Sequence, residues 1–152
     1  MTRSTMAVRP MVASEADAVL ALIVAGLTER WGEYAPGANP DLDDFPACYA
    51  GSVILVAVQE GRLVGVGILR PLGPASAEIV RMSVAAARRR EGVGSRILRE
   101  LRDVAAARGL ARISLETTAS WDSAVRFYES RGFARTRVEG GDQHFELRDT
   151  AE

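Results

Sequence analysis

Residues 84–95 decide the fold, and they read Val84-Ala85-Ala86-Ala87-Arg88-Arg89-Arg90-Glu91-Gly92-Val93-Gly94-Ser95. An apolar strand pattern ends at Val84, an arginine-rich loop follows, and a helical pattern begins at Gly92. Backbone N–H groups at a helix N-terminus, with the helix dipole behind them, suit a phosphate, and glycine lets the chain approach it closely. The stretch predicts a strand–loop–helix unit that binds an anion; the alternative is a helix start with a solvated arginine cluster. It lacks the lysine of a P-loop and the three-glycine dinucleotide fingerprint.

The pattern on both sides of this stretch alternates between strands and helices. Upstream, two apolar runs flank the turn Glu60-Gly61 and predict a hairpin. Downstream, a helical stripe of Val93, Ile97, Leu101 and Val104 ends near Gly109. The predicted strands are 52–59, 62–69, 77–84, 112–116, 133–138 and 143–148, and the predicted helices here are 92–108 and 120–130.

The first fifty residues predict a short strand at 8–11, a helix and a loop. Ser14 is expected to cap this helix, whose inner face carries Ala18, Leu22 and Ala25 with Val19 and Ile23 beside them, and which ends near Trp31-Gly32. The turn residues of 32–40 predict a loop, and 41–50 a short second helix. The whole predicts a single α/β (α+β) domain over residues 1–152, with a mixed sheet flanked by helices.

The composition of the chain argues against several classes of function. The chain has 152 residues, 47% of them apolar, and a formal net charge of -1, which argues against a nucleic-acid partner. Cys48 and His144 are the only residues of their types, so neither an internal disulfide nor a zinc or other metal site is expected. All 19 basic residues are arginine. No apolar run has the length of a signal peptide or a membrane span, so we expect a cytoplasmic protein without membrane contact.

Three ordered motifs resemble the GNAT superfamily of N-acetyltransferases. Arg89-Arg90-Glu91-Gly92-Val93-Gly94 resembles its Gln/Arg-x-x-Gly-x-Gly/Ala motif, and Ser123 to Phe133, with Phe127-Tyr128 and Gly132-Phe133, resembles its next signature. Residues 77–84 resemble the family's fourth strand, including an acidic position at Glu78. The resemblance covers residues 51–148 well and the first fifty only in outline.

The resemblance implies a site for acetyl-CoA as acyl donor. The fourth and fifth strands would splay apart to admit it, and the backbone of Met82, Ser83 and Val84 would pair with its pantetheine arm like an added strand. The amides of the loop and first helical turn would hold the pyrophosphate; these residues are Arg89, Arg90, Glu91, Gly92, Val93, Gly94 and Ser95.

The resemblance also suggests the catalytic residues. Tyr128 stands where the family commonly places the acid that protonates the departing thiolate, and a tyrosine near pKa 10 can protonate a thiolate whose acid is near 8.5. Glu78 stands where several members carry the general base, acting directly or through water. The alternatives are that Tyr128 only packs beside Phe127 and that Glu78 forms a salt bridge with an arginine such as Arg81.

The residues that bind the acceptor are predicted in the segment after the first helix. Trp31 and Tyr34 are expected to contact the acceptor, and Glu33, Asp41, Asp43 and Asp44 would favour a cationic amine; a solvated loop with buried aromatics is the alternative. Trp121 replaces the asparagine that many relatives carry before the last helix, and His144 lies on a late strand.

The sequence thus predicts transfer of an acetyl group to a primary amine of a small molecule or peptide by direct attack. The alternative is a catalytically silent module that binds or senses CoA. A homodimer formed through the last strands is also expected.

Overall fold

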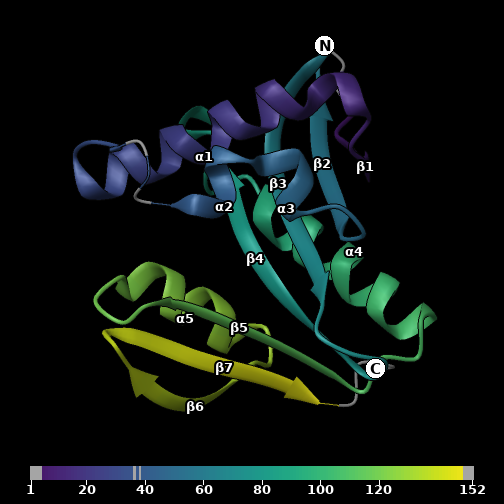
Figure 1. Ribbon diagram of the computed structural model, residues 1–152, viewed down its shortest axis with the longest axis vertical. Coiled ribbons are helices and arrows are strands. Elements are labelled where there is room, and N and C mark those ends of the chain that lie inside the picture. The colour runs from purple at the N-terminus through teal and green to yellow at the C-terminus, as the bar shows by residue number, and fades with distance from the viewer. Residues whose placement is uncertain (1–4, 36, 38, 149–152) are drawn as a thin grey trace. The chain divides into compact units, whose positions relative to one another are not determined.

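The computed structural model describes residues 5–35, 37 and 39–148. They form two compact units that interleave along the chain. The first unit runs to Arg70 and resumes from Arg81 to Leu101, and the second holds Pro71–Val80 and the described chain from Arg102 onward. The seven strands follow the order β1-β2-β3-β4-β5-β7-β6 in a mixed sheet (Figure 1), which confirms the predicted fold class. The expectation of a single domain stays a prediction.

The elements lie close to their predicted places. The first unit contains β1 (Ala7–Pro10), α1 (Ala16–Trp31), α2 (Pro40–Asp43), α3 (Phe45–Cys48), β2 (Val53–Gln59) and, as far as Arg70, β3 (Arg62–Pro71). The second contains β5 (Arg112–Thr118), α5 (Asp122–Ser130), β6 (Ala134–Glu139) and β7 (Asp142–Arg148). The strand β4 (Ser76–Val84) and the helix α4 (Val93–Ala107) contribute residues to both units, and two short 3₁₀ turns span Ala13–Glu15 and Ala86–Arg88.

The start of α1 differs from the prediction. Ser14 lies in the 3₁₀ turn and does not cap the helix. Glu15 orders this start instead, because its carboxylate accepts the Val12 N–H at 2.9 Å and two N–H groups of Arg9 at 2.9 and 2.8 Å. Sequence spacing alone does not reveal this contact with β1.

The buried stripe of α1 is also shifted from the predicted face. It centres on Val19 and Ile23, whereas Ala18 and Ala25 are exposed and Leu22 is half-buried. The larger branched side chains remove more apolar area from water than the alanines would, so they take the inner face.

The predicted helix over 41–50 is divided into α2 and α3. Pro46 has no N–H to donate to the carbonyl of Leu42, so a continuous helix cannot pass through this position. The break falls at Asp44, whose φ of −133° and ψ of 56° are not helical. Leu42 and Phe45 anchor the two short helices in the core, with 2% and 1% of their surface exposed.

The hairpin between β2 and β3 is as predicted. Glu60 and Gly61 both have positive φ, 55° and 75°, which is the geometry of a two-residue turn whose twist matches antiparallel strands. The register pairs Val56 with Val66 and Gln59 with Arg62. The hairpin sets the position of β3 beside β2.

Two glycines of β3 lie directly under α4. A Cβ on Gly65 would lie 2.7 Å from Val93 and 2.8 Å from Ile97, and one on Gly67 would lie 2.5 Å from the sulfur of Met82 and 2.7 Å from Ile97. Real side chains do not approach this closely, so glycine is required for the helix to lie against the strand. The start of α4 is held in place by this contact.

The second unit has one apolar and one polar sheet face. β5 pairs with β7 antiparallel, and β6 continues the sheet as its last strand. Ile113 and Leu115 face the same side as their partners Leu147 and Phe145, and all are buried. Figure 1 shows α5 alongside these strands, and a ring contact of 5.9 Å between Tyr128 and Phe145 places α5 on the apolar face.

The parallel pairing of β4 with β5 is short. It runs from Ser76 opposite Arg112 to Glu78 opposite Ser114, although both strands continue beyond these residues. The splay of these two strands that the resemblance implies stays a prediction.

Replacement of Gly65 tests the contact between β3 and α4. We expect Gly65→Ala to lower the stability by about 1–3 kcal/mol, because the new methyl group collides with Val93 and Ile97. For a chain of this size that corresponds to about 3–9 °C in the melting temperature. Gly73→Ala is the matched control, since a Cβ there meets nothing within 4 Å. Equal melting temperatures for the two variants would contradict the proposed packing.

Candidate active site

The loop between β4 and α4 has an irregular backbone that leads directly into the helix. Arg90 and Gly92 both have left-handed backbone, with φ of 66° and 84°. The N–H of Arg96 makes the first helical hydrogen bond, to the carbonyl of Gly92 at 3.0 Å. The N–H groups of the preceding residues of the first turn therefore have no acceptor within the helix, and the helix dipole favours an anion before them. The side chain of Val93 is buried in the core, so only its backbone can serve this loop.

The three consecutive arginines have different partners. Arg88 lies 4.0 Å from both Glu60 and Glu91, and Arg89 forms an ion pair with Glu29 of α1. The Arg90 side chain makes no ion pair within the described part of the chain. Sequence alone left these residues indistinguishable; in the structure Arg90 is the one whose charge is available to a ligand.

The predicted pantetheine strand follows an unusual residue. Met82, Ser83 and Val84 form the half-buried end of β4. Arg81, directly before them, has φ of 54°, a conformation that costs a residue with a side chain about 1–2 kcal/mol. Such strain persists only where surrounding contacts impose it.

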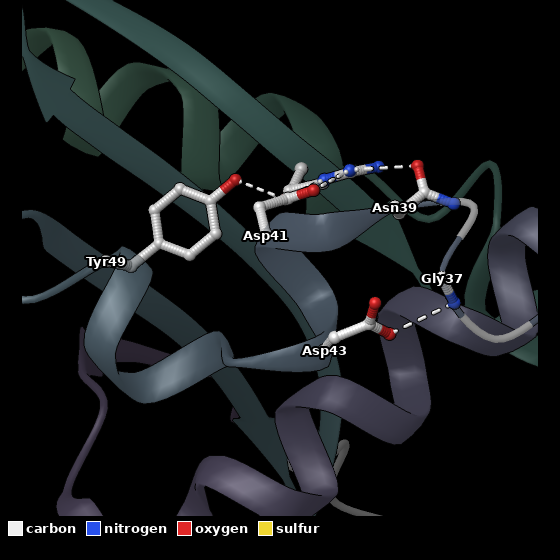
Figure 2. Close-up of polar contacts among 6 residues, drawn as sticks. Gly37, Asn39, Asp41, Asp43 and Tyr49 are labelled. Carbon is white, nitrogen blue, oxygen red and sulfur yellow. Dashed lines mark hydrogen bonds and ion pairs between the residues drawn. The ribbon is translucent and has the colours of Figure 1, made fainter.

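The contacts that impose it come from residues 39–49 (Figure 2). Arg81 donates to both carboxylate oxygens of Asp41, through Nε at 2.9 Å and Nη2 at 2.7 Å, and Nη2 also donates to the side-chain oxygen of Asn39 at 3.1 Å. The hydroxyl of Tyr49 donates to Asp41 at 2.6 Å. We call these four residues the Asp41 cluster.

The cluster shifts the pKa values of its members. Burial acts to raise the pKa of Asp41, but the hydrogen bonds from Arg81 and Tyr49 outweigh it and leave that pKa lowered. Burial and the hydrogen bond to Asp41 raise the pKa of Tyr49 to about 12. At neutral pH Asp41 is therefore ionised and Tyr49 protonated. The sequence analysis counted Asp41 among the acidic residues of the acceptor segment and named Arg81 only in the alternative for Glu78. Nothing in the local pattern indicated that Asp41 and Arg81 belong together.

Tyr128 lies in an aromatic group within the second unit. It is 9% exposed, and its ring meets Phe127 at 5.1 Å, Phe133 at 6.0 Å and Phe145 at 5.9 Å. The ring is thereby fixed in orientation. Packing beside Phe127 is present as expected, and it does not conflict with an acid role for the hydroxyl.

Glu78 projects from the other face of the same sheet. Its neighbours Ala77 and Ile79 are buried, and it stands opposite Ser114, which in turn pairs with Glu146. These side chains belong to the polar face, where a cavity of about 280 Å³ is lined by Glu78, Arg112, Ser114, Leu115, Thr136, Arg137, His144, Phe145 and Glu146. The structure therefore does not bring Glu78 and Tyr128 onto one face. Nε2 of His144, which also lines this cavity, lies 3.2 Å from a carboxylate oxygen of Glu116.

In the segment expected to contact the acceptor, part of the negative charge is neutralised or engaged in hydrogen bonds. Trp31 at the end of α1 is 60% exposed, and Tyr34 is half-buried. Asp41 is neutralised by Arg81, and Asp43 accepts the N–H of Gly37 at 3.4 Å. Trp121 precedes α5 as its N-terminal flanking residue.

The comparisons with known proteins agree with this arrangement. The profile of the Acetyltransferase (GNAT) family matches residues 17–133, so the chain belongs to that family. It is 40% identical over 73 residues to the uncharacterized N-acetyltransferase YsnE of Bacillus subtilis, covering 47% of this chain and 48% of that protein. It is 31% identical over 85 residues to the probable N-acetyltransferase camello of Xenopus laevis, covering 55% and 39%. The matched segments thus span about half or less of these curated relatives.

Solved structures share the fold. A GNAT-family acetyltransferase of Staphylococcus aureus Mu50 superposes with a TM-score of 0.83 at 17% identity, covering 95% of this chain and 99% of that one. The PaiA N-acetyltransferase of Thermoplasma acidophilum, solved in complex with coenzyme A, gives 0.82 at 15% identity, with the same coverage. Among the described residues, no helix combines the length and apolarity needed to span a membrane.

The Asp41 cluster predicts a pH dependence of stability. The pKa of Asp41 is lowered in the folded protein, so its contribution is complete above the unfolded value of about 3.9 and is lost as the pH falls through the folded value. We expect the urea midpoint of the wild type to fall as the pH drops below about 4, and that of Asp41→Asn to fall less. Identical slopes for the two proteins between pH 5 and pH 2.5 would contradict an ionised, stabilising Asp41.

Proposed function

We propose that the protein is an acetyl-CoA-dependent N-acetyltransferase that transfers the acetyl group to a primary amine of a small molecule or peptide. The observation that carries the proposal is the left-handed backbone at Arg90 and Gly92 directly before the N-terminus of α4, in a chain of the GNAT acetyltransferase family. The coenzyme A bound to the structurally similar PaiA enzyme supports the choice of donor.

The donor would be held by backbone and by charge. We assign the pantetheine arm to the backbone of Met82, Ser83 and Val84, as an added strand. We assign the pyrophosphate to the backbone amides of residues 89–95. Gly92 and Gly94 would let it approach the backbone closely. Arg90 supplies the charge that no carboxylate of the described chain neutralises.

The chemistry is direct attack by the amine. Its lone pair forms a bond to the thioester carbonyl carbon, the carbon–sulfur bond breaks, and the sulfur leaves as a thiolate. We assign the proton that the thiolate takes to the hydroxyl of Tyr128, which recovers one from solvent. We assign the proton that the amine loses after its attack to Glu78, acting through water.

The acceptor end is assigned to Trp31 and Tyr34. The exposed indole of Trp31 offers an aromatic face to a cationic amine before it loses its proton. Since Asp41 is paired with Arg81, attraction of a cation would come from the exposed carboxylates Glu33 and Asp44 instead.

Two further expectations remain predictions. β6 is the last strand of the sheet, which supports a homodimer, but its exposed side chains include Arg135, Arg137 and Glu139, and charge on an edge opposes pairing. A cytoplasmic location also remains a prediction.

The first test separates binding from turnover. We expect the melting temperature to rise by several degrees with acetyl-CoA at about 100 times its Kd and to remain unchanged with ATP. Tyr128→Phe keeps the ring packing, so it should still bind acetyl-CoA while turnover with an accepted amine falls by about 10²–10⁴-fold. Binding by the wild type without turnover of any amine in a broad panel would favour the silent CoA-binding module. Absence of any melting shift at millimolar acetyl-CoA would refute the donor site.

Removal of a competing carboxylate should tighten donor binding. Glu29 pairs with Arg89, and the hydrogen bond from Arg89 lowers the pKa of Glu29, so a phosphate must displace an ionised carboxylate. We expect Glu29→Gln to lower the Kd for acetyl-CoA by up to about fivefold, which is what an exposed pair of this kind is worth. Glu100→Gln, which breaks the half-buried pair with Arg96 on α4, is the control and should leave the Kd unchanged. Weaker binding by Glu29→Gln would show that Glu29 orients Arg89 rather than competing for it.

A further inference from the structure

The Asp41 cluster joins two segments that are 40 positions apart in sequence. Arg81 belongs to β4, and Asn39, Asp41 and Tyr49 belong to the segment of α2 and α3. Helices of four residues are too short to persist alone, so α2 and α3 depend on such contacts. The Arg81 guanidinium donates three N–H···O hydrogen bonds, so the side chain has little conformational freedom.

The position of Arg81 in β4 gives this cluster a functional consequence. The left-handed φ of 54° falls directly before Met82, at the entry to the segment assigned to the pantetheine arm. A residue in this conformation turns the following peptide away from the direction it would have in a regular strand. The direction in which the N–H and C=O groups of Met82–Val84 point therefore depends on Arg81 keeping its backbone conformation.

We propose that the ion pair between Asp41 and Arg81 is a positioning element for the acyl donor: it fixes the left-handed backbone at Arg81 and so aims the backbone of Met82–Val84. This inference rests on the proposed function for the identity of the ligand. Arg81 is a positioning residue here, because it acts through the backbone that follows it. The same pair also keeps Asp41 from serving as an acceptor-binding carboxylate.

A comparison of methionine with glycine at position 81 tests the proposal. Both remove the guanidinium, but glycine adopts positive φ without strain whereas methionine does not. Each is combined with Asp41→Asn, so that no carboxylate loses its cation. The readouts are the Kd for acetyl-CoA and the hydrogen-exchange rates of the amides of Met82–Val84 in the free protein.

The expected result is a split between the two variants. Asp41→Asn/Arg81→Met should bind acetyl-CoA about tenfold more weakly than the wild type and exchange the Met82–Val84 amides about tenfold faster. Asp41→Asn/Arg81→Gly should stay within about threefold of the wild type in both. The control is Arg9→Met with Glu15→Gln, which removes a similar bidentate pair at the start of α1 and should change neither readout.

Two results would overturn the proposal. One is an equal loss in the glycine and methionine variants, which would assign the effect to the side chain alone. The other is wild-type exchange at Met82–Val84 in the methionine variant. If the wild type does not bind acetyl-CoA, the proposed function fails, and the exchange rates still decide whether Arg81 sets the backbone.

Discussion

The close approach of α4 to β3 is the contact on which the proposed donor site depends. Gly65 and Gly67 leave that face of β3 without side chains, and Val93 and Ile97 occupy the space. Because Val93 is the first residue of α4, its packing sets where the open N–H groups of the first turn point. The polar loop is thus positioned by apolar packing just behind it, in a part of the protein where a single added methyl group is felt.

The strands and long helices could be predicted from the sequence because their causes are local. Alternating apolar residues, the Glu60-Gly61 turn and the glycine after α4 act over a few positions, and the structure reproduces all of them. The errors occurred where a distant contact or a proline overrides the pattern. Glu15 rather than Ser14 orders the start of α1 because it reaches Arg9, and Pro46 divides the expected helix over 41–50.

The sequence pointed to candidate site residues but not to their relations, and the roles of those residues stay predictions. Motif resemblance pointed to Glu78, Tyr128 and the glycine loop, yet the sheet directs Glu78 to the face opposite the one that Tyr128 packs on. The pairing of Arg81 with Asp41 depends on folding of the intervening chain, and no periodicity encodes it. The sequence analysis counted Asp41 among the acidic residues of the acceptor segment, whereas in the structure its charge is paired with Arg81.

The number of arginines in the loop between β4 and α4 overstates the positive charge that a ligand would meet there. Of its three cations, Arg88 lies near Glu60 and Glu91 and Arg89 pairs with Glu29. Arg90 is therefore the one cation of the described loop that no carboxylate neutralises. In the proposed donor site, selectivity for a phosphate would come from backbone geometry, namely the left-handed backbone of Arg90 and Gly92 and the N–H dipoles at the start of the helix. Fixed dipoles act only at contact distance, whereas net charge attracts any anion from afar. A loop of this kind favours a ligand that fits its backbone over free anions, in a protein whose net charge is -1.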